Sequence, residues 1–207
     1  MTDTTDTFLT ALNAERRRIS TTSKRGIGMP AAGLLFWLAA AWLTRRFPAP
    51  QAVLYTFFLT GLVFPVGVAL TRAAGGNLFT RSAGLTPLGL QLAALQAFFW
   101  PIIILVYRLS PEWTPWAMAI LFGAHFLPYA WLHRSRAYAF LSASVAVSLS
   151  GLALVTRAPM TAAVPLVAAA CYAAAIVWMW AENRGLASDD DVETLPRDRG
   201  KVAVRRH

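Results

Sequence analysis

The chain has 207 residues, 57% of them hydrophobic, and its mean hydropathy of +0.49 excludes an ordinary water-soluble domain. Its formal net charge of +9 is spread over the termini and short loops instead of being gathered on one face, which argues against nucleic-acid binding. The single cysteine, Cys171, excludes an intramolecular disulfide.

The first 26 residues form a polar leader that ends in a cluster of basic side chains. Asp6 can cap a short helix that places Phe8, Leu12 and Ile19 on one side. Two interpretations stay open for residues 1–26. The leader is either a solvated cytoplasmic segment whose arginines fix the topology, or an interfacial helix lying along the inner membrane surface.

Six apolar stretches follow, each long enough to cross about 30 Å of hydrocarbon as a helix. No Asp, Glu, Lys or Arg falls inside any of them. Residues 27–181 are therefore predicted to form an all-α, polytopic membrane helical bundle of six transmembrane helices arranged as three helical hairpins. The predicted spans are 27–44, 52–71, 88–107, 116–132, 137–156 and 162–181.

The basic residues between these spans indicate an orientation. The leader, the second and fourth loops and the tail hold five, two, two and six Lys or Arg residues, in that order. The first, third and fifth loops, which lie on the other side of the membrane, hold two, one and one. The positive-inside rule then predicts that both termini are cytoplasmic. The alternately charged residues 182–207 are predicted to be a disordered cytoplasmic tail. The expected inner-side markers are Lys24, Arg72 and Arg134, and the outer-side markers are Arg45, Arg108 and Arg157.

A repeat relates the first two hairpins. Phe36-Trp37 and Phe99-Trp100 are separated by 63 residues, and the basic and proline residues after them follow the same spacing. Each indole N–H must find an acceptor in hydrocarbon. We therefore expect Trp37 to donate a hydrogen bond near the carbonyl of Gly61, and Trp100 to donate one near that of Ala124.

Prolines inside the predicted spans are a second source of polar groups. Each removes a backbone hydrogen bond and frees the carbonyl four residues earlier. Such kinks either line a substrate cavity or are absorbed by packing, and the sequence leaves both open. The interior prolines are Pro65, Pro101, Pro128 and Pro165.

His125 is the candidate functional side chain at mid-membrane depth. Imidazole titrates near neutrality, so His125 is either a proton relay or ligand contact, or a hydrogen-bonded core residue. We expect it to face the bundle interior, with Gln96 of the third span and Tyr129 one turn along as partners. The chain has no buried carboxylate pair and no metal-ligand spacing, so we expect no catalytic residue, metal or cofactor.

Two segments carry a family resemblance: Gly33–Trp37 (GLLFW) and Gly123–Tyr138 (GAHFLPYAWLHRSRAY). They resemble a family of small bacterial multi-pass membrane proteins of unknown function. The resemblance spans about Gly26–Tyr138 and rests mainly on the histidine-containing fourth helix. It implies no activity, substrate or catalytic residue. Separately, we expect the chain to lie in the plasma membrane, the inner membrane of a bacterium, with both termini in the cytoplasm.

Two functions compete at this stage. The first is a small permease or channel-like protein, and the second is a non-transporting membrane component, such as a stress-related protein or an assembly partner. A polar cavity reaching His125 would favour the first, and a dry, close-packed bundle the second. The expected partner is the lipid bilayer, and a second copy or another membrane protein remains open.

Overall fold

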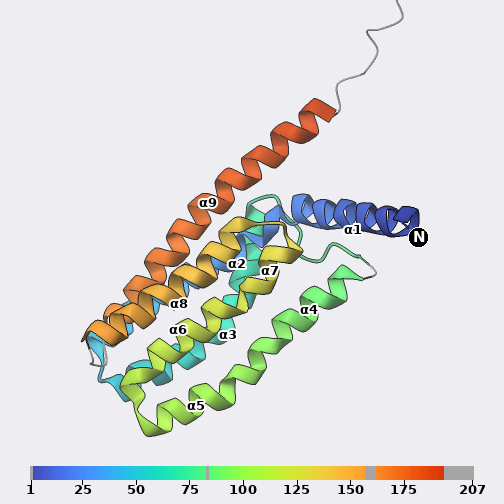
Figure 1. Ribbon diagram of the computed structural model, residues 1–207. Coiled ribbons are helices and arrows are strands. Elements are labelled where there is room, and N and C mark those ends of the chain that lie inside the picture. Colours follow the sequence, from blue (N-terminus) through green and yellow to red (C-terminus); the bar gives the residue numbers. More distant parts are fainter. Residues whose placement is uncertain (1, 83, 157–161, 194–207) are drawn as a thin grey trace, which may run out of the picture.

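The computed structural model describes residues 2–82, 84–156 and 162–193, and within them it contains helices and no strand (Figure 1). The predicted all-α class is confirmed for these residues. Short 3₁₀ helices (η) link several of the α-helices. In chain order the elements are α1 (Thr2–Thr22), η1 (Lys24–Gly26), α2 (Gly28–Arg46), α3 (Ala49–Ala73), α4 (Leu85–Leu95), η2 (Gln96–Phe99), α5 (Trp100–Leu109), η3 (Pro111–Trp113), α6 (Thr114–His125), α7 (Leu127–Leu132), α8 (Arg136–Thr156) and α9 (Ala163–Glu193).

Five segments are long and apolar enough to cross a membrane, and each overlaps one predicted span. The remaining prediction, a continuous helix over 116–132, differs from the structure. Two shorter helices, α6 and α7, occupy it and are separated at Phe126. Pro128 has no N–H to give to the carbonyl of Ala124, so the helix cannot continue through this point without losing a bond. The five segments are Lys24–Arg46, Ala49–Ala73, Leu85–Leu109, Arg136–Thr156 and Ala163–Gly185.

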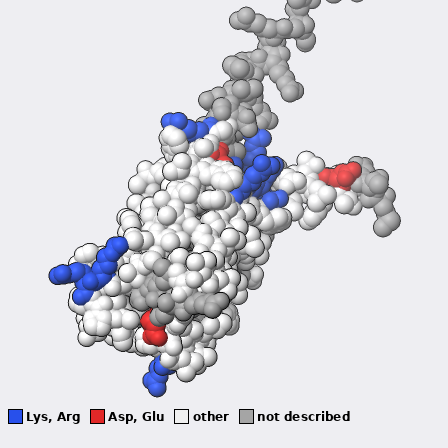
Figure 2. Space-filling view, turned by 60° about the vertical axis from the view of Figure 1, so that its left-hand side comes forward, with Lys and Arg blue, Asp and Glu red and all other residues white. Residues whose placement is uncertain are grey.

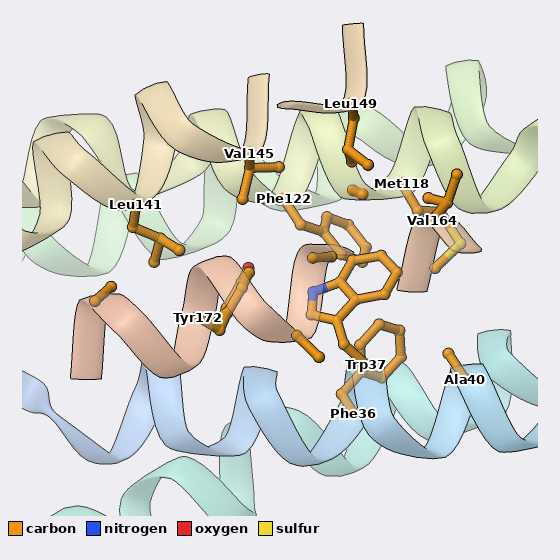
Figure 3. Close-up of a cluster of buried hydrophobic side chains, with 14 of the residues drawn as sticks. Phe36, Trp37, Ala40, Met118, Phe122, Leu141, Val145, Leu149, Val164 and Tyr172 are labelled. Atoms are coloured by element: carbon orange, nitrogen blue, oxygen red, sulfur yellow. The ribbon is translucent and has the colours of Figure 1, made fainter. Parts of the chain in front are cut away.

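The core lies between α2, α6, α8 and α9 (Figure 3). At its centre Trp37 is 1% exposed, and Phe36 meets its ring edge-on with centroids 4.9 Å apart. α2 can approach α9 closely because Gly33 has no side chain, and a Cβ at that position would overlap the ring of Tyr172. Tightly interlocked apolar side chains therefore fill the middle of the bundle.

α3 packs along α2 at a similar close approach. A Cβ on Gly28 would overlap the backbone of Gly67 and Thr71, so only glycine fits at this crossing. Small residues that let two backbones meet are a common basis of helix packing in lipid. The rest of α3 exposes large apolar side chains such as Phe58 and Leu62.

The segment Leu85–Leu109, formed by α4, η2 and α5, is the least buried of the long helices and is called the outer arm here. Only 6% of its most apolar stretch is buried, and in Figure 1 it runs along one edge of the bundle. It touches α3 through Trp100, whose ring meets Phe57 edge-on at 5.3 Å, and through the Tyr107 hydroxyl, 3.4 Å from the Pro50 carbonyl oxygen. Most of the outer arm thus faces away from the bundle, while Ile103 is fully buried in the main core.

Charged side chains gather at the two ends of the molecule, with a broad uncharged belt between them on the face that Figure 2 shows. At one end the Asn77 N–H donates to the Thr22 carbonyl (2.9 Å), and Ser20 donates to the His133 carbonyl (3.0 Å). These bonds place the chain next to Lys24, Arg72 and Arg134 at one end of the bundle. Arg45 and Arg108 lie at the opposite end, near the Tyr107–Pro50 contact, and Arg157 lies outside the described residues.

Both terminal segments differ from prediction. α1 is helical from Thr2, so Asp6 lies inside the helix and does not begin it. The predicted disordered tail starts at Glu182, but α9 continues through that residue to Glu193, and residues 194–207 lie outside the described part. The carboxylate of Glu182 binds the start of α8, which gives the extension an anchor.

The four prolines have three different settings. Pro65 stands inside the continuous helix α3. Pro101 and Pro128 are each the second residue of a helix that follows an interruption. Pro165 was predicted to be interior, but it is the third residue of α9, where its missing N–H has no intrahelical acceptor to lose.

Candidate functional site

Two helix interruptions meet at His125. α4 changes at Gln96 into the 3₁₀ helix η2 before Pro101, and α6 ends at His125 before Pro128. The rings of Phe99 and His125, one beside each interruption, meet edge-on with centroids 6.3 Å apart. The structure therefore places two proline-interrupted helices side by side, as is typical of discontinuous helices at membrane binding sites.

The His125 ring lies among aromatic side chains. It is half-buried and meets Phe126 and Tyr129 edge-on, at 5.8 and 5.5 Å. Its Nδ1 atom is buried without a hydrogen-bond partner. A buried polar atom left unpaired costs about 1–3 kcal/mol, so Nδ1 would gain by binding a ligand that hydrogen-bonds to it.

The expected partners of His125 are only partly assembled. Tyr129 is in ring contact with it, but the Tyr129 hydroxyl donates to the Gly89 carbonyl of α4 at 3.2 Å. Among the hydrogen bonds of the described residues, none joins Gln96 to His125. Gln96 lies in η2, half-buried, on the neighbouring interrupted helix.

The expected indole pairings are not found among the hydrogen bonds of the described residues. The Trp37 indole nitrogen points toward Tyr172 of α9 (Figure 3), and Trp100 packs on Phe57. Gly61 lies on the exposed side of α3, with open space where a side chain would stand.

A second polar cluster, absent from the sequence-based predictions, joins three distant segments at the end of the bundle near α1. Its centre is Glu182 of α9. This carboxylate accepts hydrogen bonds from the Ser135 hydroxyl (2.6 Å) and from the backbone N–H groups of Arg136 (2.9 Å) and Ala137 (3.2 Å). The negative charge thus sits at the N-terminus of α8, where the helix dipole favours it.

Arg25 completes this cluster from η1. Its side chain is nearly buried, its Nε lies 3.6 Å from Glu182, and its Nη1 donates to Asn183 at 3.0 Å. Asn183 in turn donates to the Lys24 carbonyl (3.0 Å), and Tyr138 donates to the Arg25 carbonyl (2.7 Å). We call Arg25, Ser135, Tyr138, Glu182 and Asn183 the Arg25 latch, because they tie the leader to α8 and α9.

The backbone at the latch is strained. Lys24, Arg25 and Gly26 have φ values of 50°, 52° and 63°, in the left-handed region, and Arg134 has 49°. Non-glycine residues there cost about 1–2 kcal/mol each, so neighbouring contacts must hold them in place. The latch supplies those contacts for Arg25, and it fixes the sharp turn from α1 into α2.

His133 lies beside the latch, in the turn between α7 and α8. It is 6% exposed and stacks between Tyr129 and Tyr138, with ring centroids 6.1 and 5.8 Å away. Burial, and secondarily the charge of Arg25, lower its pKa from 6.5 to about 4. His133 is therefore neutral at pH 7.

Two of the latch residues were predicted to have other roles. Arg25 was counted among the topology-fixing charges and Glu182 was assigned to the tail. One signal was available: Glu182 directly follows the last apolar run, at the end of the bundle where the loops carry only basic side chains. An acid in that position predicts an ion pair between Glu182 and one of the neighbouring arginines.

A family model described as a family of unknown function (DUF7010) matches residues 12–182. The matched region runs from the middle of α1 to Glu182 and so includes both interrupted helices and both charged members of the latch. No curated protein and no solved structure matches the chain.

Proposed function

The chain belongs to the DUF7010 family of unknown function, and we propose that it is a six-span membrane protein acting as a small permease through a site at His125. Five long apolar helices support the membrane placement, with α6 and α7 together serving as the sixth, broken span. The charge bias between alternate loops supports cytoplasmic termini and a plasma-membrane location. In a bacterial cell this is the inner membrane.

One observation carries the permease assignment: two proline-interrupted helices meet at an imidazole whose Nδ1 is buried without a partner. The carbonyls freed by the two prolines, those of Ala97 and Ala124, accept from the N–H groups of Trp100 and Phe126. The unpaired Nδ1 of His125 is therefore the group that a solute would bind between the two interrupted helices. One of the two helices belongs to the outer arm, of whose most apolar stretch only 6% is buried. The outer arm can therefore shift against the core and open the site alternately to each side.

The chemistry of the site indicates the class of solute. Imidazole, amide and phenol groups from His125, Gln96 and Tyr129 surround the interruptions, and the predicted spans contain no Asp, Glu, Lys or Arg. A charged solute would find no opposite charge at that depth. A small, uncharged, hydrogen-bonding solute fits the site best, and none of these groups is assigned a catalytic or metal-binding role.

A specific observation favours the second candidate, a non-transporting membrane component. The core between α2, α6, α8 and α9 is apolar and closely packed around Trp37. The Arg25 latch also closes the end of the bundle near α1. Under this alternative, His125 is a core residue and the protein acts by binding other membrane components.

Solute flux in proteoliposomes separates the two. Stopped-flow light scattering would follow entry of a panel of small uncharged solutes, such as urea, glycerol and acetamide, into vesicles with and without the protein. The permease assignment predicts faster entry of at least one solute, lost in His125→Ala and retained in part by His125→Gln. Trp42→Phe, at an exposed site, is the matched control. A correctly inserted protein that speeds no solute would instead support the non-transporting component.

A further inference from the structure

α1 projects sideways from one end of the bundle in both Figure 1 and Figure 2. Its second half is held against the bundle, where Ile19 packs on Leu85 and Leu132. Leu85 is the first residue of α4 and Leu132 the last of α7. α1 therefore lies at the level where the apolar helices begin and end, which in a bilayer is the headgroup region.

One face of α1 carries an apolar stripe that continues beyond the bundle. Phe8, Leu12 and Ile19 follow one another at spacings of four and seven residues, so they share a face. Ile19 is buried and Leu12 partly buried against the bundle, while Phe8 is 65% exposed. The face that packs on the bundle at Ile19 is therefore uncovered at Phe8.

Basic groups converge at the inner end of the same stripe. The Arg16 guanidinium lies over the Trp131 ring, 4.2 Å from its centroid, and donates through Nε (3.0 Å) and Nη2 to the Trp131 carbonyl. The backbone N–H of Arg134 donates to the same carbonyl at 3.3 Å, and its side chain is exposed. Partial burial, and then the nearby charge of Arg134, lower the pKa of Arg16. Nη1 of Arg16 also donates to Asn13 at 3.1 Å. Arg16 and Arg134 thus meet at one carbonyl, the first through its guanidinium and the second through its backbone, and an anion beside it would be stabilised by both charges.

We propose that α1 is an in-plane anchor on an anionic lipid surface. Phe8 and its exposed neighbour Leu9 insert into the acyl boundary, and Arg16 and Arg134 together bind the phosphate of an anionic phospholipid. This inference rests on the membrane placement in the proposed function, but not on transport. It assigns to α1 a lipid partner that neither the family match nor the fold provides.

Fluorescence quenching in lipid nanodiscs tests the anchor. Single cysteines at Phe8, Thr10 and Leu105, in a Cys171→Ala background, would carry an environment-sensitive bimane label. Thr10 is the matched control, because two residues along a helix turn the side chain about 200° to the opposite face. Leu105 lies on the exposed outer arm and reports insertion of the bundle. The nanodiscs contain phosphatidylcholine with or without phosphatidylglycerol, plus spin-labelled quencher lipids.

We expect the label at residue 8 to be quenched severalfold more than the label at residue 10, and more strongly with phosphatidylglycerol present. Arg134→Gln should remove the phosphatidylglycerol effect, and Arg108→Gln, the same charge change at the other end, should not. Equal quenching at residues 8 and 10, with residue 105 quenched, would overturn the anchor and leave the membrane placement intact. An unquenched residue 105 would overturn both.

Discussion

Removing the carboxylate of Glu182 is the sharpest test of the Arg25 latch. Glu182→Ala deletes three hydrogen bonds, at 2.6, 2.9 and 3.2 Å, and leaves the guanidinium of Arg25, 7% exposed, without its counter-charge. Removing one partner of a buried ion pair costs about 3–5 kcal/mol. Because Glu182 is partly exposed and Arg25 keeps Asn183, we take the lower end, about 3 kcal/mol. Glu182→Gln keeps an accepting oxygen and should cost about half as much.

Thermal unfolding in detergent, followed by tryptophan fluorescence, measures this loss. At about 2–4 °C per kcal/mol for a chain of this size, Glu182→Ala should lower Tm by roughly 6–12 °C and Glu182→Gln by roughly 3–6 °C. Glu112→Ala, which removes an acid from the opposite end, is the control and should leave Tm unchanged. If Glu182→Ala melts within about 2 °C of the unmodified protein, the latch contributes nothing measurable and the reasoning is refuted.

Three further predictions follow from burial and close packing. The pKa of His133 is lowered from 6.5 to about 4 in the folded state, so the unfolded chain binds the proton at a higher pH than the folded chain does. The contribution of His133 to stability should therefore be full above about pH 6.5 and fall as the pH drops toward 4. His133→Phe should reduce the change in Tm over that range. Trp37→Ala empties a site that is 1% exposed and should cost about 3–5 kcal/mol in the same unfolding assay, while Trp42→Ala should cost almost nothing there. Gly28→Val should force α2 and α3 apart and yield little folded protein by size-exclusion chromatography, whereas Gly61→Val, in open space, should behave as the parent protein.

The long helices could be predicted because each corresponds to an uncharged apolar run of about the length that a helix needs to cross a bilayer. Apolar runs bounded by Arg and Pro predicted five segments, four of which end within a few residues of the structure, while the last, α9, continues to Glu193. The periodicity of Phe8, Leu12 and Ile19 likewise indicated a helical leader, although Asp6 was placed at its start and not inside it. These predictions rest on properties that neighbouring residues carry together.

The interruption at Phe126 could be only half predicted. Pro128 predicts the loss of one backbone hydrogen bond. Pro65 removes the same bond from α3, however, and α3 continues through it. Whether a helix bends or breaks depends on what its neighbours offer at that depth. The outer arm is also irregular at this level, where η2 separates α4 from α5, and Phe99 of η2 contacts His125 at the end of α6.

The latch and the indole contacts could not be predicted, because they depend on which segments meet. Arg25 and Glu182 are far apart in the chain, and the residues around each give no indication that the two side chains pair. The repeat was also misleading about environment: Trp37 is buried at the centre of the core, while Trp100 packs at its edge on the outer arm. The same sequence pattern has different partners because one copy lies inside the bundle and the other outside.

Cysteine accessibility across the membrane tests the central claim, a bundle that crosses the bilayer with Arg72 and Arg134 at the cytoplasmic end and Arg45 and Arg108 at the other. Single cysteines at these positions, in a Cys171→Ala background, would be treated with a membrane-impermeant maleimide in intact cells and again after lysis. We expect residues 45 and 108 to react in intact cells, and residues 72 and 134 only after lysis. Reaction of residues 45 and 72 from the same side would contradict the account.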